Sequence, residues 1–93
     1  MLIYTENKLV YVWDRDGKKY MIDKHLADLE HELDHTVFFR VNRQNIVNIG
    51  YIKCYRTWEK VKLRIELTMA GPDHPIIISQ ETAPCFRRWI SQL

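Results

Sequence analysis

The sequence predicts a mainly β fold, in which antiparallel sheets are accompanied by one or two short helices. Short runs rich in β-branched and aromatic residues recur along the chain, and such residues favour strands. Turn-forming Gly, Pro, Asp and Asn separate these runs. Apolar residues at helical spacing occur in only two stretches. With 93 residues, 46% of them hydrophobic and 28% charged, the chain is predicted to form one globular domain.

The N-terminal part predicts a hairpin followed by a short helix. LVYVWD (9–14) and KYMID (19–23) are predicted strands, because an Asp-Gly pair, a strong hairpin turn signal, lies between them. Asp23 is then predicted to cap a helix that ends at His35. The apolar residues of this helix are spaced to share one face: Leu26, Leu29 and Leu33.

Further strands are predicted in the centre of the chain. VFFRV (37–41) begins a strand, which the polar run NRQN (42–45) interrupts. IVNIGYIKCYR (46–56) is predicted as one extended run with a bulge or kink at Gly50. Residues 61–68 alternate strictly, which places four apolar side chains on the inner face of a strand: Val61, Leu63, Ile65 and Leu67.

The C-terminal part predicts one buried strand and one amphipathic helix. PIIIS (75–79) follows a turn containing Gly and Pro at residues 70–75 and is expected to be covered on both faces. The final helix is predicted to begin with Thr82 as N-cap and Pro84 in its first turn. Its apolar stripe suits core packing first and a partner surface second: Phe86, Trp89, Ile90 and Leu93.

The stretch HELDH (31–35) matches H-E-x-x-H, the signature of many zinc metalloproteases. On a helix, His31 and His35 share a face, but that face points away from the leucine stripe that docks on the domain. A catalytic zinc also needs a third protein ligand and a walled cavity, and no later segment is a clear source of either. HELDH is therefore interpreted as a solvated helix face. The sequence predicts no metal site, no cofactor and no enzymatic activity.

Cysteine usage and hydropathy predict a cytoplasmic protein. Cys54 and Cys85 have no CxxC companion and lie among apolar or aromatic neighbours, so reduced, partly buried thiols are expected. No apolar run is long enough to span a membrane, and the N-terminus MLIYTENK lacks the layout of a signal peptide.

The net charge of +2 is distributed unevenly. Residues 1–39 carry 5 Lys/Arg and 8 Asp/Glu, residues 40–64 carry 7 Lys/Arg and one Glu, and residues 65–93 carry 2 Arg and 3 acidic residues. The middle block is therefore strongly basic, and it also contains two tyrosines and a tryptophan. A polyanion-binding surface and an ordinary solvated sheet face both fit this pattern.

The run FFRVNRQNIVNIGYI (38–52) is the most informative part of the chain. Its apolar residues frame a cluster of side chains that can hydrogen-bond base edges and phosphates, since Arg suits guanine and Asn or Gln suits adenine. An ordinary polar loop between strands explains the same composition, so these residues alone leave both interpretations open. The cluster consists of Arg40, Asn42, Arg43, Gln44 and Asn45.

The segment FFRVNRQNIVN (38–48) resembles the signature of the LytTR DNA-binding domain, roughly F-x-R-[VI]-[HN]-R-[SQ]-x-[IV]-V-N. GKKYMIDKHLADLEHEL, IGYI and the late IIIS with its helix resemble the other parts of that domain in order, so the resemblance covers nearly the whole chain. It implies a LytTR-like fold, an elongated arrangement of antiparallel β-sheets with little helix. It also implies an output domain of response regulators in bacterial two-component systems.

The resemblance implies sequence-specific binding of double-stranded promoter DNA, and hence transcription regulation. Loops would enter successive major grooves, and paired direct repeats in the DNA imply a dimer. Residues 1–93 would be a single domain, the C-terminal part of a longer regulator with its N-terminal strands partly trimmed. An upstream receiver domain and a sensor kinase are the expected partners. The alternative is a protein-interaction module that uses the C-terminal amphipathic helix.

Within the signature, the resemblance implies that Asn42, Arg43 and Gln44 contact bases or the DNA backbone. Arg40 is implied as a phosphate contact or as a framework residue of the motif. Many members have His where this chain has Asn42, so the base preference does not carry over.

Two other regions are implied as contacts. Asn7 and Lys8 match a contact loop near the start of the domain, and Ser79 and Gln80 match a turn after the late strand. The family often has a Ser-Arg pair at this turn, and Glu81 next to it would repel phosphate. The third region is therefore the weakest part of the carry-over.

Overall fold

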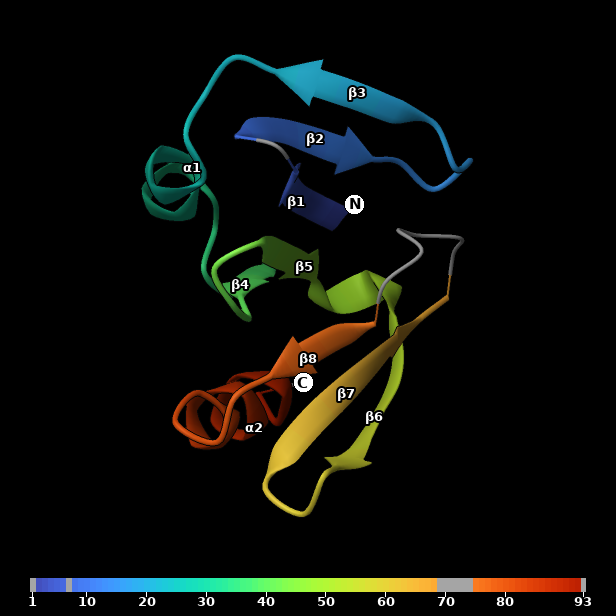
Figure 1. Cartoon of the computed structure of the whole chain (residues 1–93), viewed down its shortest axis with the longest axis vertical. Coiled ribbons are helices and arrows are strands. Elements are labelled where there is room, and N and C mark those ends of the chain that lie inside the picture. Colours follow the sequence, from blue (N-terminus) through green and yellow to red (C-terminus); the bar gives the residue numbers. More distant parts are fainter. Residues whose placement is uncertain (1, 7, 69–74, 93) are drawn as a thin grey trace.

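The computed structural model describes residues 2–6, 8–68 and 75–92, arranged as two antiparallel sheets and two helices (Figure 1). Its principal dimensions are 35 × 26 × 25 Å. The elements in chain order are β1 (Leu2–Glu6), β2 (Leu9–Trp13), β3 (Lys19–Ile22), α1 (Leu26–Glu32), β4 (Phe38–Arg40), β5 (Asn45–Asn48), the 3-10 helix η1 (Ile49–Tyr51), β6 (Ile52–Trp58), β7 (Lys62–Leu67), β8 (Ile76–Ile78) and α2 (Ala83–Ile90). The predicted mainly β fold is confirmed.

The larger sheet has five strands in the order β3-β2-β1-β5-β4. Its central strand, β1, pairs antiparallel with β2 and with β5, so that Ile3 lies between Val12 and Ile46. The sequence does not predict β1. Leu2, Ile3 and Tyr4 are all buried, and a strand covered on both faces shows no apolar-polar alternation.

The smaller sheet has the order β6-β7-β8. The turn between β6 and β7 places Glu59 and Lys60 in the left-handed backbone region, with φ of 49° and 71°. The loop has three residues, Glu59 to Val61, because Trp58 pairs with Lys62. Two successive left-handed residues without a glycine are unusual, since Gly or Asn commonly takes this conformation. The turn between β2 and β3 follows the predicted rule instead, since Gly17 takes the positive φ of 82°.

The central strands of the five-stranded sheet, β1 and β5, are covered on both faces, and their successive side chains enter opposite cores. On one face, Ile3, Val10 and Ile46 pack against Leu26 and Leu29 of α1. On the other face, the smaller sheet and α2 close a larger core (Figure 1). This core contains Leu2, Val41, Val47, Leu63, Ile65, Ile76, Ile78, Ala83, Phe86 and Trp89.

Helix α2 contributes its apolar stripe to this core. Phe86 is fully buried and Trp89 is 5% exposed. The Trp89 ring stacks on Phe39 of β4 at 5.1 Å, and Phe86 makes an edge contact with Tyr55 of β6 at 5.2 Å. Core packing is therefore confirmed as the role of these two residues. Leu93, predicted for the same stripe, lies outside the described residues.

Helix α1 is shorter than predicted. It begins at Leu26, with His25 at the N-cap position, so the predicted cap at Asp23 is wrong. It ends at Glu32, because Leu33 has an extended backbone and His35 lies in the following turn. Leu33 lies outside the helix but is half-buried against the cluster that contains Leu26 and Leu29.

Three further expectations are wrong. The run 46–56 is not one strand, since η1 separates β5 from β6 and sends them into different sheets. Val61 is 49% exposed, because it lies in the hairpin turn before β7 begins.

Cys54 and Cys85 are free, as expected, but both are exposed, so the expected partial burial is wrong. The turn predicted at 70–75 lies mostly outside the described residues.

Candidate nucleic-acid interface

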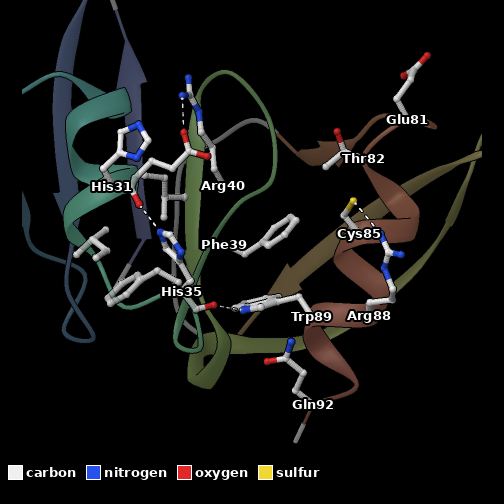
Figure 2. A pocket seen from close by; sticks show the side chains of 14 residues that line it. His31, His35, Phe39, Arg40, Glu81, Thr82, Cys85, Arg88, Trp89 and Gln92 are labelled. Carbon is white, nitrogen blue, oxygen red and sulfur yellow. Dashed lines mark hydrogen bonds and ion pairs between the residues drawn. The ribbon is translucent and has the colours of Figure 1, made fainter.

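The HELDH stretch borders an open groove between α1 and α2 (Figure 2). The groove has a volume of about 810 Å³. His31 and His35 line it on the α1 side, and Trp89 and Arg88 line it on the α2 side. The two histidines of the zinc motif therefore border the same groove.

The two histidines do not form an H-E-x-x-H pair. His31 is on α1, whereas His35 lies three residues beyond the end of the helix. The His35 Nε2 donates to the Glu30 carbonyl at 2.8 Å, and the His35 carbonyl accepts from the Trp89 indole at 2.8 Å. In the part of the chain that the structure describes, no three His, Cys, Asp or Glu residues are grouped to hold a metal ion.

The turn after α1 is held by Asp34. Its carboxylate accepts hydrogen bonds from the Thr36 hydroxyl at 2.7 Å and from the Thr36 amide at 2.9 Å. These bonds favour the charged carboxylate and lower the pKa of Asp34 below its ordinary value. The Asp34 carbonyl accepts from the amides of Val37 and Phe38, so the same residue leads the chain into β4.

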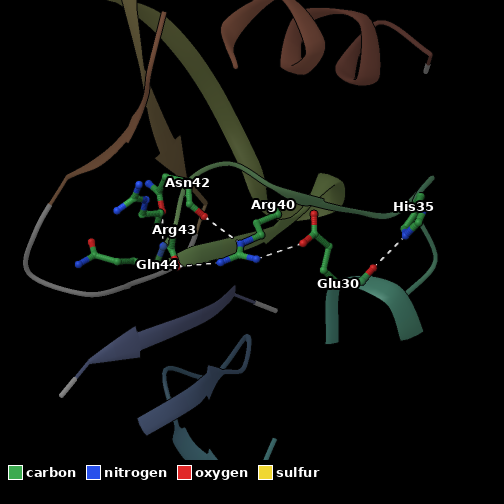
Figure 3. Close-up of polar contacts among 6 residues, drawn as sticks. All are labelled: Glu30, His35, Arg40, Asn42, Arg43 and Gln44. Atoms are coloured by element: carbon green, nitrogen blue, oxygen red, sulfur yellow. Dashed lines mark hydrogen bonds and ion pairs between the residues drawn. The ribbon is translucent and has the colours of Figure 1, made fainter. Parts of the chain in front are cut away.

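The predicted DNA contacts centre on the signature loop, residues 41–44, which joins β4 to β5 (Figure 3). Backbone hydrogen bonds close this loop and attach it to the sheet. The Val41 amide donates to the Asn45 carbonyl at 3.0 Å, and the Thr5 amide donates to the Gln44 carbonyl at 2.8 Å. The loop is thus an extension of the central strands rather than a loose connection.

Asn42 ties the signature loop to the second sheet. Its Nδ2 donates to the Ile77 carbonyl of β8 at 3.0 Å. Its Oδ1 accepts from the Gln44 amide at 2.8 Å and from the Nδ2 of buried Asn45 at 3.1 Å. Both polar ends of this half-buried side chain are therefore engaged within the protein.

Arg40 holds the same loop from the other side. Its Nε donates to the Asn42 carbonyl at 3.3 Å and its Nη2 to the Arg43 carbonyl at 3.2 Å. Its Nη1 meets the Glu30 carboxylate of α1 at 3.1 Å. The guanidinium lies among protein partners, which favours the framework role over the phosphate contact.

Arg43 and Gln44 differ from these two residues, because their side chains are exposed. In Figure 3 both extend away from the Arg40–Glu30 contact. They are the members of the predicted cluster that are free to meet another molecule.

The signature loop lies between the two other predicted contact regions. An open hollow of about 830 Å³ is lined by Arg43, Gln44 and the end of β1, which leads to the turn with exposed Lys8. A second hollow of about 400 Å³ is lined by Arg43 together with Ser79 and Thr82. Residues far apart in the sequence are thus neighbours here.

The members of the two flanking regions are placed as follows. Lys8 has a positive φ of 67° and holds the β1–β2 turn. Ser79 and Gln80 are exposed between β8 and α2, and the Ser79 hydroxyl bonds to the Thr82 hydroxyl at 3.3 Å. Asn7 lies outside the described residues.

A basic face continues from the signature loop. It is the outer face of β6 and β7 and consists of Arg56, Trp58, Lys62 and Arg64, which are cross-strand neighbours in two pairs. Arg64 also lies opposite Ile77 of β8, and Ile77 lines the hollow beside Arg43. Ile77 therefore lies between the basic face and the signature loop.

The charges of the basic face have local partners. The Arg64 guanidinium lies 5.0 Å from the centre of the Trp58 ring. Arg56 is paired with Glu66, and Lys62 with Glu59 at 3.2 Å. These contacts are at the surface, where ion pairs are weak and exchange readily for other anions.

The sequence did not indicate two of these contacts. Glu30 meets Arg40 although ten residues separate them, and Asn42 meets Ile77 across 35 residues. Neither pair has a local spacing rule that could predict it. For Arg64 and Trp58, the sequence indicates only that they belong to a basic, aromatic block.

Comparisons with known proteins agree on one family. The LytTr DNA-binding domain family matches residues 1–91. The chain belongs to the LytTr DNA-binding domain family. A solved LytTr DNA-binding domain from Bacillus cereus, of a protein described as a methyl-accepting/DNA response regulator, has the same fold with a TM-score of 0.81 and 22% identity. The match covers 97% of this chain and 79% of that one. Comparison with curated proteins gives no match.

The LytTr match confirms the resemblance seen in the sequence and the LytTR-like fold that the resemblance implies. It supports DNA binding and transcription regulation as the general activity. Neither helix of the described residues has the length and apolarity that a membrane crossing requires.

Proposed function

We propose that this LytTr domain binds double-stranded promoter DNA in a sequence-specific manner, as the non-enzymatic output domain of a cytoplasmic bacterial response regulator. The observation that carries the proposal is the signature loop. Its backbone is fixed by Arg40 and Asn42, and the exposed side chains of Arg43 and Gln44 are directed outward. Fixed backbone with free polar ends is the arrangement that reads base edges efficiently.

In this mechanism the loop enters a major groove, where the side chains meet hydrogen-bonding groups unique to each base pair. Arg43 can bond guanine with two nitrogens, and Gln44 can bond adenine with its amide. Lys8, Ser79 and Gln80 flank the loop and are proposed to contact the DNA on either side. Glu81 is exposed next to that turn and is kept out of the proposed contact set, because a carboxylate repels phosphate.

The basic face is proposed to supply attraction to phosphates. Arg56, Lys62 and Arg64 replace a surface partner with a DNA phosphate, which releases counterions and makes binding depend on salt. Phosphate attraction does not depend on base sequence, so it adds affinity while the signature loop provides specificity.

The proposed partners are a second copy of the domain, since direct repeats place two domains on one duplex, together with an upstream receiver domain and a sensor kinase. The Bacillus cereus structure, a domain of a protein described as a response regulator, supports the response-regulator part of this proposal. A protein-interaction role for α2 has less support, because Phe86 and Trp89 are packed in the core.

A selection and a salt titration test the proposal. The purified domain is used to enrich duplexes from a pool with a randomised core, and binding to an enriched duplex and a scrambled duplex is then measured at several salt concentrations. We expect one enriched sequence, a preference of at least about a thousandfold over the scrambled duplex, and a steep negative slope of log affinity against log salt. Absence of binding to any duplex at low salt would contradict the proposal.

A further inference from the structure

We infer that Glu30 of α1 is a positioning residue for sequence reading, although it lies outside the signature. The inference rests on the proposed DNA-binding function. The Glu30 carboxylate holds the Arg40 guanidinium at 3.1 Å, and that guanidinium holds the carbonyls of Asn42 and Arg43 at 3.3 and 3.2 Å (Figure 3). The Arg40 side chain therefore links α1 to the backbone of the signature loop, which carries Arg43 and Gln44.

Because the guanidinium is rigid, the contact with Glu30 fixes the orientation of the nitrogens that hold the loop. Its nitrogens lie in one plane and form a rigid fork, so a partner on one nitrogen sets the direction of the others. In Arg40, Nη1 is held by Glu30 while Nε and Nη2 hold the loop. Without the Glu30 carboxylate, the Arg40 guanidinium can rotate. Its hydrogen bonds to the Asn42 and Arg43 carbonyls, both longer than 3 Å, are then expected to weaken.

The link is expected to affect recognition more than folding. The side chains of Arg40 and Glu30 are 26% and 43% exposed, and an ion pair this accessible to water stabilises a protein only weakly. A small displacement of Arg43 and Gln44 matters more, because base contacts depend on a fixed geometry.

Electrostatics alone predicts the opposite sign. Removing a negative charge from a DNA-binding protein strengthens its attraction to every duplex. Positioning predicts that Glu30→Ala weakens binding to the enriched duplex and spares binding to the scrambled one. The direction of the change therefore separates the two explanations.

Glu32→Ala is the matched control. Glu32 belongs to the same helix and has the same charge, but it pairs with Lys24 at 2.7 Å rather than with Arg40. Both variants are tested on the enriched and the scrambled duplex. We expect Glu30→Ala to lose about three- to tenfold in affinity for the enriched duplex only, which is the range for one ordinary hydrogen bond. Glu32→Ala is expected to bind both duplexes at least as tightly as the unmodified chain.

A second variant and a second readout keep the inference testable if Glu30→Ala folds poorly. Arg40→Lys keeps the positive charge but loses the fork, so it is expected to show the same selective loss. In either folded variant, the Gln44 amide, which donates to Asn42, should exchange hydrogen faster than in the unmodified chain.

Two failures are distinguishable. If the unmodified domain binds no duplex, the proposed function is wrong. If it binds an enriched duplex and both Glu30→Ala and Arg40→Lys keep its full preference, the function stands and Glu30 has no positioning role.

Discussion

The signature loop and the basic face adjoin each other but are built differently. In the loop, the Asn42 side chain holds the backbone through bonds to Ile77, Gln44 and Asn45, and Arg43 and Gln44 extend outward from that fixed frame. On the basic face, charged side chains lie over the outside of a sheet that the opposite face already stabilises. The loop therefore presents two exposed side chains on a fixed backbone, whereas the basic face presents charges that are held only by weak surface contacts.

This difference suggests a division of labour between sequence reading and general attraction. A fixed loop loses little conformational entropy on binding and can therefore discriminate between bases. Charges on a sheet surface can pair with any phosphate backbone and contribute affinity that depends on salt. Substitutions in the two regions should therefore have different signatures, which the following predictions use.

The largest effect is expected for Asn42→Ala. The substitution leaves the Gln44 amide and the Ile77 carbonyl without their partner, and unpaired polar groups of this kind cost about 2–3 kcal/mol of unfolding free energy. Denaturant unfolding measures the loss, and the preference for the enriched duplex should fall with it.

Asn48→Ala is the control for this prediction. Asn48 caps η1 by accepting from the Gly50 amide at 2.8 Å, so its loss also removes a side-chain-to-backbone bond, but not in the signature loop. Equal losses of DNA preference in both variants would mean that Asn42 acts only through stability.

Arg43→Ala is expected to leave stability unchanged and to cost about 1–3 kcal/mol of specific binding, the range for a bidentate base contact. Fluorescence anisotropy with enriched and scrambled duplexes measures the difference. Arg87→Ala removes the same charge from an exposed position on α2 and serves as control. An unchanged affinity of Arg43→Ala for the enriched duplex would remove Arg43 from the reading set.

Arg64→Gln should have a smaller and uniform effect. If Arg64 neutralises one phosphate, its loss reduces the slope of log affinity against log salt by about 1 for both duplexes. Lys24→Gln, on the α1 side of the sheet, should leave the slope unchanged. A selective loss for the enriched duplex would instead make the basic face part of sequence reading and erase the contrast between the regions.

The smallest effect concerns pH and the turn that leads into β4 and the signature loop. Bonds from Thr36 lower the pKa of Asp34, so this carboxylate stabilises the fold above its unfolded pKa of about 4 and loses that contribution as pH falls through its lower folded pKa. Asp34→Asn should therefore be slightly less stable than the unmodified chain at pH 7. The two denaturant midpoints should converge at strongly acidic pH, and a gap that persists there would exclude the linkage.

The prediction of fold from sequence succeeded where local rules apply. The Asp-Gly hairpin, the alternating β7 and the apolar stripe of α2 each have a period or a turn signal that belongs to one segment. It failed where tertiary contacts override the local pattern. β1 is buried on both faces and so has no alternation, and η1 breaks a run that reads as one strand.

The HELDH stretch matches the zinc motif in sequence but not in structure, because helix α1 ends within it. The pattern requires both histidines on one helical turn, but Asp34 forms a competing turn with Thr36 and the helix stops at Glu32. In an ideal helix the two histidines point away from the leucines, which already disfavours a zinc site. The structure adds a stronger reason, since His35 is not helical.

The sequence by itself determined the family, the mainly β class and the position of the polar cluster, because these follow from residue order and short-range spacing. Only the tertiary structure separated Arg43 and Gln44, which are free, from Arg40 and Asn42, which are engaged. That separation depends on partners in α1 and β8, ten and 35 residues away along the chain. Residues of one polar run look alike in a sequence, and packing against distant elements decides which of them face outward.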